Sequence, residues 1–229
     1  MGIQQVMITP CKSEQELLER FGCYGFEKQF TFYDVIGDSN WQIDIDQGVI
    51  HFDEDITFSI QLLGSFSLSS ETWLWSWNNE ASQLPTPVIE QALSLKHYGE
   101  ENNIDLFTVG QFVATEADLY KIGAIAAGMF DTNGFYLADF GQGIALVTVK
   151  RDHIDHNTRN QTQICETFSE FIANFDVNHY QALKYYLIAK DYQIEPSDLT
   201  DHSTLVAIKG QERIVAQFDQ QSRLISLNG

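Results

Sequence analysis

Apolar side chains recur at every second position in several short segments between residues 26 and 77. Alternation of this kind is typical of strands that bury one face and leave the other in water. Asp46-Gln47-Gly48 lies between two such segments and supplies the residues of a tight turn. The predicted strands are residues 26–35, 41–45, 49–52, 56–66 and 72–77. Because the links between them are short, we expect an antiparallel meander.

Helical spacing dominates much of the remaining chain. The pattern Ser13-x-x-Glu16 predicts a short helix over residues 13–20, and Thr115-x-x-Asp118 begins a helix that runs to about Phe130. Three more helices are predicted at residues 88–98, with Gly99 as the stop, at 160–173 and at 177–190. Further strands are predicted at residues 135–138, 144–149, 204–208, 213–218 and 224–227.

This order of elements predicts the α+β class. We expect an antiparallel β-meander covered on one face by helices, then a C-terminal helical pair and a small β-meander. The polar stretch 152–163 suggests a boundary, with a sheet-plus-helix domain at residues 1–151 and the helical pair and last strands at 152–229. A single continuous domain stays an open alternative, because a chain of this length can share one core.

Small residues cluster on one predicted helix. Gly123, Ala124, Ala127 and Gly128 follow one another within two turns of the helix that begins near Thr115. Without bulky side chains at these positions, another element can approach the helix backbone closely.

The most distinctive local feature is the run Thr72-Trp73-Leu74-Trp75-Ser76-Trp77-Asn78. Strand alternation places the three indoles on one face, where they form a rigid wall. One interpretation is that this wall belongs to the core. The other is a stacking platform at the mouth of a pocket, with Trp73, Trp75 and Trp77 contacting a ligand and Asn78 supplying hydrogen bonds.

The tryptophan run carries a family resemblance. Together with the preceding Leu63-Gly64-Ser65-Phe66 and the later Tyr98-Gly99, it resembles a family of uncharacterised bacterial proteins with a TWLW-x-W-x-N core motif. Trp41-x-Ile43-Asp44 and Gly48-x-Ile50-x-Phe52 also suit that pattern, and the similarity covers residues 15 to 150. The family is a domain of unknown function, so the resemblance implies an intracellular bacterial protein and transfers no catalytic residue.

Patterns that could carry chemistry are weak. The two histidines in Arg151-Asp152-His153-Ile154-Asp155-His156 have helical spacing, but a third metal ligand is missing from a stretch that resembles a loop. Asp44-x-Asp46-x-Gly48 lacks most positions of a calcium loop and suits a hairpin turn. We predict no catalytic residue, no metal site and no cofactor, and a non-enzymatic protein is favoured although the enzyme class is left open.

Charge is more informative than any motif. Acidic residues outnumber basic ones 32 to 13, which gives a formal charge of −19 and disfavours nucleic acid as a partner. The 67 residues from Gln29 to Leu95 contain no Lys or Arg but ten acidic residues. A field of one sign speeds association with a basic protein. The candidate partner-binding residues are those in the predicted hairpin turns, namely Asp44, Asp46, Asp53, Glu54 and Asp55.

Cysteine usage and hydropathy bear on the compartment. Cys11, Cys23 and Cys165 are odd in number and have no CxxC spacing, which suits free thiols in a reducing compartment. The longest run low in charge is much shorter than the roughly 20 residues of a membrane span. We therefore expect a cytoplasmic protein without a membrane partner.

Three functional hypotheses remain. The leading one is a non-enzymatic module that binds a basic protein, in its concrete form an immunity-type protein that covers the positive cleft of a toxin such as a nuclease. The alternative is a small-molecule-binding protein or enzyme with a pocket beside Trp73, Trp75 and Trp77. The third is a subunit of a larger assembly whose acidic face meets only solvent. The oligomeric state is not predicted.

Overall fold

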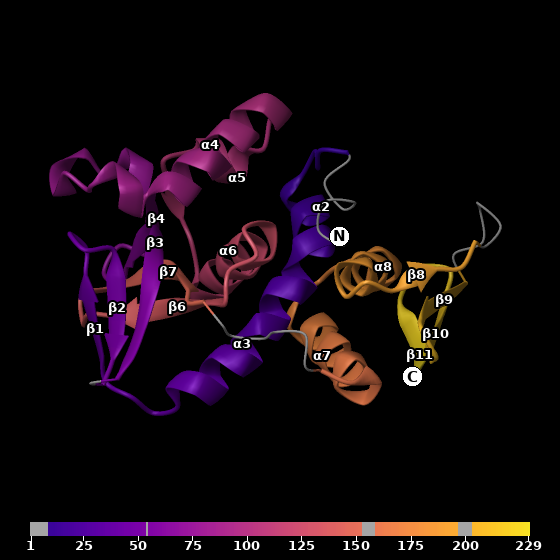
Figure 1. The fold of residues 1–229 in the computed structure, drawn as a ribbon. Helices are drawn as coiled ribbons and strands as arrows, with labels where there is room; N and C mark the ends of the chain where they lie inside the picture. Colours follow the sequence, from indigo (N-terminus) through magenta and orange to yellow (C-terminus); the bar gives the residue numbers. More distant parts are fainter. Residues whose placement is uncertain (1–8, 54, 153–158, 197–202) are drawn as a thin grey trace.

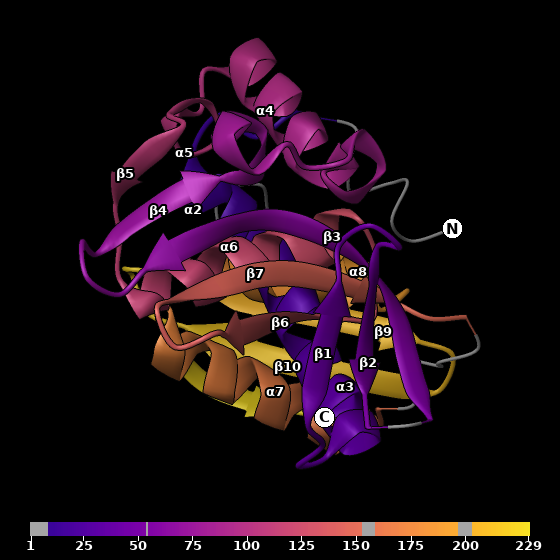
Figure 2. The same cartoon turned by 90° about the vertical axis from the view of Figure 1, so that its left-hand side faces the viewer.

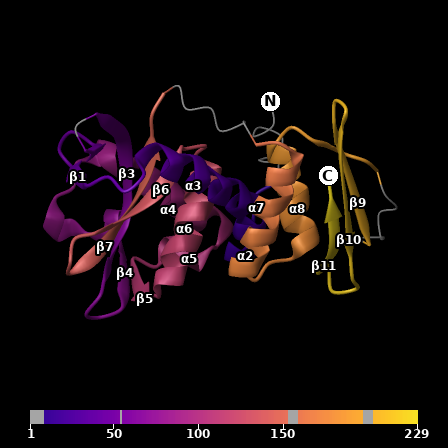
Figure 3. The same ribbon diagram turned by 90° about the horizontal axis from the view of Figure 1, so that it is seen from below.

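The computed structural model describes residues 9–53, 55–152, 159–196 and 203–229. Helices occupy its centre, a large sheet lies on one side of them and a small sheet on the other (Figure 1). The α+β class predicted from the sequence is confirmed. Figure 3 shows the same three layers from below.

The large sheet is antiparallel and seven-stranded. Its strands are β1 (Trp41–Asp44), β2 (Val49–Phe52), β3 (Ile56–Ser67), β4 (Thr72–Trp75), β5 (Gln111–Val113), β6 (Gly134–Asp139) and β7 (Gly143–Lys150). The first five follow one another in the order β1-β2-β3-β4-β5, while β7 pairs with both β3 and β6. Figure 2 shows β3, β7 and β6 side by side with α6 behind them. The meander from residue 41 onward is therefore confirmed, and the sheet also recruits two later strands.

The predicted first strand, residues 26–35, is wrong. These residues belong to a nearly continuous helical rod made of α2 (Glu14–Leu17), a π-helical turn (Leu18–Gly22) and α3 (Cys23–Ile36). Ser13 caps the rod by accepting a hydrogen bond from the Glu16 amide, as the sequence predicts. Gly37, at φ 54°, ends it before β1.

α3 packs directly against α6 (Glu116–Met129), which begins with the predicted capping box between Thr115 and Asp118. A Cβ added to Gly25 would collide with the carbonyl oxygen of Ala124, and one added to Gly128 with that of Phe21. The two helix backbones therefore touch where their glycines meet. This confirms the close approach predicted from the small residues of α6.

The segment after β4 contains three 3₁₀ turns (Ser76–Asn78, Glu80–Ser82 and Thr86–Val88) and two helices. The first helix, α4 (Glu90–Asn102), continues past the predicted stop at Gly99 and ends at Asn103, which adopts a left-handed conformation with φ 57°. A Cβ at Gly99 would lie 2.7 Å from that of Phe107 in α5 (Asp105–Thr108). Gly99 thus serves the packing of α5 rather than the end of α4.

The C-terminal elements follow the prediction closely. They are α7 (Gln161–Asn174), α8 (His179–Ala189) and a four-stranded antiparallel sheet of order β11-β10-β9-β8. Its strands are β8 (Gln193–Ile194), β9 (Thr204–Lys209), β10 (Glu212–Phe218) and β11 (Leu224–Asn228). The short β8 is an addition to the three predicted strands.

Two apolar clusters fill the interior. The larger one extends across the predicted boundary at residue 151, since it contains Phe21 and Trp73 as well as Phe168, Leu183 and Ile214. The smaller one lies between the curled β1–β3 region and the end of α3, and includes Phe32, Phe52, Phe58 and Val149. α3 contributes to both clusters, so it is the central element of the fold.

Two ion pairs, one of them fully buried, fix α3 to its neighbours. Glu27 accepts from the Lys190 ammonium at 2.7 Å, and both side chains are almost completely buried. Burial raises the pKa of the Tyr186 phenol well above its usual value, so the phenol stays protonated and donates to the second oxygen of Glu27. One residue further along, Lys28 binds Asp131 at 2.5 Å. These contacts join α3 to α8 and to the loop after α6.

Membrane insertion as a helix has no support in the described segments, where each helix is too short or too polar to cross a bilayer.

Candidate functional site

The tryptophan run lies mainly in the core. Trp73 and Trp75 are fully buried with their rings 5.3 Å apart in a T-shaped contact. The indole N–H of Trp75 donates to the carbonyl oxygen of Leu106 at 3.0 Å. The strand ends at Trp75, so the predicted continuation to Trp77 is wrong.

Trp77 and Asn78 lie apart from the other two indoles, in the 3₁₀ turn after β4. Trp77 is half-buried and the Lys96 ammonium lies 4.8 Å from the centre of its ring. Asn78 is exposed and packs closely against Gly110. The four residues predicted to contact a ligand therefore do not converge on one hollow, and none of them lines the two hollows described next.

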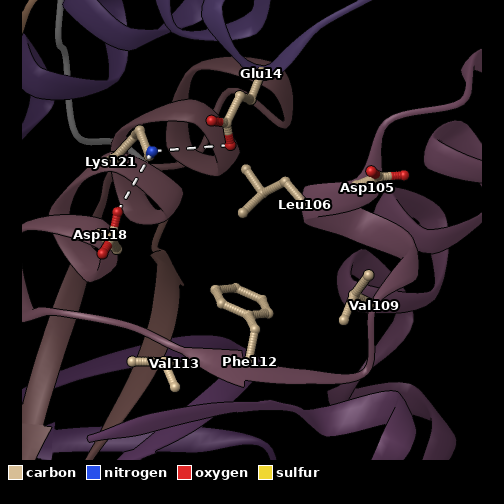
Figure 4. A pocket seen from close by; sticks show the side chains of 8 residues that line it. All are labelled: Glu14, Asp105, Leu106, Val109, Phe112, Val113, Asp118 and Lys121. Carbon is tan, nitrogen blue, oxygen red and sulfur yellow. Dashed lines mark ion pairs between the residues drawn. The ribbon is translucent and has the colours of Figure 1, made fainter.

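The first hollow lies beside the tryptophan strand and has a volume of about 300 Å³ (Figure 4). It is called here the β5 pocket. Leu106 and Phe112 point into it, Val109 and Val113 complete its apolar part, and Leu106 is the same residue that accepts from Trp75. Its charged lining residues are Glu14, Asp105, Asp118 and Lys121. They come from α5 and α6, which are close together in the sequence, and from the distant α2.

Charge in the β5 pocket is predominantly negative. Lys121 lies between Asp118 at 3.4 Å and Glu14 at 3.8 Å, whereas Asp105 is exposed and forms no ion pair within the described residues. The rim thus carries three carboxylates and one ammonium group, and Asp105 lies across the hollow from Lys121 (Figure 4). An apolar surface with an acidic rim suits a ligand that combines an apolar group with a positive charge.

The second hollow, of about 350 Å³, is polar. It lies between β3, β7 and α4, where its amide and hydroxyl groups bond to one another. The side-chain oxygen of Gln61 accepts from the backbone amide of Gln91 at 3.0 Å, and the side-chain oxygen of Gln91 accepts from the Thr148 hydroxyl at 2.7 Å. Because these groups are already paired, the second hollow offers a ligand fewer free contacts than the β5 pocket.

The predicted partner-binding residues form two groups rather than one. Asp44 and Asp46 lie at the β1–β2 turn, and Asp53 and Asp55 at the β2–β3 turn. The four residues of β2 separate the turns by about 13 Å. Glu54 lies outside the described residues. The two groups therefore occupy opposite ends of one short hairpin.

Both turns use carboxylates structurally. Asp44 accepts from the backbone and side-chain amides of Gln47, which confirms hairpin chemistry for the Asp44-x-Asp46-x-Gly48 pattern. Asp53, at φ 50°, accepts from the Asn40 amide. These bonds hold the carboxylates of Asp44 and Asp53 in fixed directions.

The described acidic residues of the segment without Lys and Arg form no ion pairs within the described chain. Nine of its ten carboxylates are described, all but Asp44 are exposed, and none forms an ion pair with another described residue. They are Asp34, Asp38, Asp44, Asp46, Asp53, Asp55, Glu71, Glu80 and Glu90. The fold thus brings no basic side chain of the described chain to neutralise them.

The described residues contain no cluster of metal ligands. His153 and His156 of the possible metal loop lie outside the described residues, and no three His, Cys, Asp or Glu side chains converge elsewhere in the described chain. Cys11 and Cys23 are buried and Cys165 is half-buried, and none of the three is in a disulfide. Burial raises the pKa of each thiol, which disfavours the reactive thiolate.

Sequence reasoning missed the residues of the β5 pocket. Val109 to Val113 form a short apolar run between two helices, and this run was the available signal. Pocket formation depends on the packing of α2 and α6 around that run, which local spacing does not reveal.

These features define an acidic α+β protein in which two antiparallel sheets flank a helical layer. The chain belongs to a family of unknown function, DUF6882, whose profile matches residues 15–151. The predicted membership of a family of unknown function over residues 15 to 150 is therefore confirmed, whereas the TWLW-x-W-x-N motif and the bacterial origin stay predictions. Searches of curated proteins and of solved structures gave no match.

Proposed function

We propose that this protein is a non-enzymatic binding protein whose partner is a basic protein. The observation that carries the proposal is the set of nine described carboxylates without an ion pair in residues 29–95. Unpaired charges of one sign repel one another and raise the energy of the folded chain. A partner with Lys and Arg side chains removes this cost and is attracted from a distance.

The β1–β2 hairpin is the proposed centre of the interface. Its turns hold Asp44 and Asp53 in fixed directions, which lowers the ordering cost of binding, and the exposed residues Asp46 and Asp55 lie in the same turns. In its concrete form the proposal is an immunity-type protein that covers the positive cleft of a toxin such as a nuclease. The two acidic turns, about 13 Å apart, would then contact separate parts of the cleft.

The first prediction concerns partner capture. We expect the tagged protein to capture a basic protein from lysate of its source organism at low salt and to lose it at about 0.5 M salt, where screening is strong. Replacing Asp44, Asp46, Asp53 and Asp55 together by asparagine should slow association with that protein about tenfold. Asparagine keeps one acceptor oxygen at each position, which suffices for the backbone amides of Gln47 and Asn40, so the hairpin should stay folded. Surface plasmon resonance with the purified partner measures the rate.

The matched control removes the same number of charges elsewhere. It replaces the exposed residues Glu101, Glu116, Glu166 and Glu170 by glutamine. Equal slowing in both variants would show a dependence on total charge alone and would contradict a role of the hairpin. Capture of no salt-sensitive basic protein by the unaltered chain would refute the proposed function itself.

A second candidate function is small-molecule binding in the β5 pocket. The observation that favours it is the bond from the Trp75 indole to Leu106, a residue of the pocket lining. A ligand at Leu106 would change the surroundings of that indole without touching it. The candidate ligand is an apolar amine, because the rim carries three carboxylates and one lysine.

Tryptophan fluorescence tests this second candidate. We expect phenethylamine to change the emission of the unaltered protein by about 10% or more on saturation, and phenylacetate to have no effect because the rim is acidic. Trp75→Phe keeps an aromatic ring in the core and should remove most of the change. A response that persists in Trp75→Phe, or that both compounds produce equally, would contradict binding at this pocket.

A further inference from the structure

β5 is an edge strand of the large sheet. Its inner side pairs with β4 in the register Thr72↔Val113, Trp73↔Phe112 and Leu74↔Gln111, and no described strand pairs with its outer side. Val113 is 78% exposed, the highest value among the large hydrophobic residues of the described chain. The edge of the sheet therefore presents an apolar side chain to solvent.

The backbone groups on the outer side follow from the ladder. The Trp75 amide donates to the Gly110 carbonyl at 3.0 Å, and the Ala114 amide to the Glu71 carbonyl at 3.0 Å. Since antiparallel pairs alternate, the N–H and C=O of Phe112 point inward to Trp73. Those of Gln111 and Val113 point outward. Four backbone groups are therefore in position to pair with a further strand.

The β5 pocket lies on the face that such a strand would share with Phe112. Residues directly opposite each other in a sheet project to the same face. A residue placed opposite Phe112 would thus direct its side chain toward Leu106 and the apolar part of the pocket.

The acidic rim of the β5 pocket favours basic residues in the added strand. Lys121 is already held by Glu14 and Asp118, while Asp105 has no ion pair within the described residues. A Lys or Arg two positions away from the inserted apolar residue projects to the same face of the sheet and would pair with Asp105. An acidic residue there would meet three carboxylates, which costs binding energy.

We propose that the β5 edge docks an extended segment of a partner protein, which adds a strand to the sheet and inserts an apolar side chain into the β5 pocket, with a Lys or Arg two positions away on the same face. Strand addition of this kind combines backbone hydrogen bonds with pockets for alternate side chains. This inference rests on the proposed function, because it takes the partner to be a basic protein. It identifies a second contact region, separate from the β1–β2 hairpin.

Selection of displayed peptides tests the docking site. Random peptides of about ten residues are selected on the unaltered protein, and the binding of labelled winners is measured by fluorescence anisotropy. We expect sequences in which an apolar residue has a Lys or Arg two positions away. Val113→Pro removes an outward N–H without touching the bonds to β4, and should raise Kd about tenfold. Val113→Thr keeps the N–H and the shape, and should change Kd less than about twofold.

A second variant covers the event that Val113→Pro does not fold, which circular dichroism will show. Asp105→Asn alters an exposed residue and should raise Kd several-fold, about threefold at low salt and less at high salt. Selection that yields no peptides overturns the proposal. Peptides weakened by Asp105→Asn but not by Val113→Pro also overturn it, because they indicate a side chain or small cation in the pocket without strand addition.

The partner protein from the capture experiment separates the two proposals. If the unaltered chain captures no basic protein, the proposed function fails. If it captures one that Val113→Pro and Asp105→Asn bind equally well, the docking site fails while the proposed function stands. Loss of capture in these variants, with the hairpin intact, supports both.

Discussion

Replacing Lys190 by methionine is expected to lower the free energy of unfolding by about 3–5 kcal/mol. The substitution preserves most of the side-chain volume but removes the ammonium group that lies 2.7 Å from Glu27. Glu27 then keeps only the phenol of Tyr186 as a partner in a site that water does not reach. Urea denaturation followed by circular dichroism measures the loss.

The control and the double variant separate charge from packing. Lys96→Met removes an exposed ammonium that pairs with Glu100 at 3.6 Å, and should cost less than about 1 kcal/mol. Glu27→Gln combined with Lys190→Met leaves no buried charge at the pair, so it should be more stable than Lys190→Met alone. Equal losses in Lys96→Met and Lys190→Met would show that the buried pair has no special role.

Gly25→Ala is expected to destabilise the protein by about 3 kcal/mol. In an exposed helix this substitution stabilises by roughly 0.5–1 kcal/mol, because alanine is the better helix former. Here the new Cβ would meet the carbonyl oxygen of Ala124, which is backbone and cannot rotate away. The predicted sign is therefore opposite to that of helix propensity. Thermal and urea unfolding both measure it.

Asp34→Ala is the matched control for Gly25→Ala. Asp34 lies in the same helix and is exposed, so its replacement should change stability by less than about 0.5 kcal/mol. A stabilised Gly25→Ala protein would mean that α3 and α6 can separate without loss, which contradicts the packing described above. Gly128→Ala should resemble Gly25→Ala, since its Cβ would meet the carbonyl of Phe21.

Most elements could be predicted from the sequence where one face is buried and the other is wet. The β1–β2 hairpin and α7 follow their patterns because each has a clear apolar side, and α6 is marked by the capping box at its start. α3 does not, since it lies between two clusters. Phe26 packs toward Phe171 in the larger cluster, with ring centres 5.9 Å apart, while Phe32 faces the smaller one. Apolar residues on several sides hid the helical period and produced the false strand.

Trp73 and Trp75 could be placed on one buried face from alternation alone, but the end of the strand could not. The backbone turns at Ser76 because α4 returns against this region, which is a tertiary effect. The candidate residues divide in the same way. The acidic turns were visible in the sequence, whereas the β5 pocket depends on how α2 and α6 pack around β5. α6 follows β5 directly in the chain, but α2 precedes it by about 90 residues.

The match to the family ends at residue 151, whereas the cation that neutralises Glu27 is at residue 190. The family segment of this chain is therefore incomplete as a hydrophobic and electrostatic unit, because one side of its central helix α3 packs against α7 and α8. A relative with a different second half must present another apolar surface to Phe26. It must also either supply another cation to pair with the glutamate at position 27 or carry a neutral residue at that position. In relatives that share both halves, we therefore expect the residues at positions 27 and 190 to vary together.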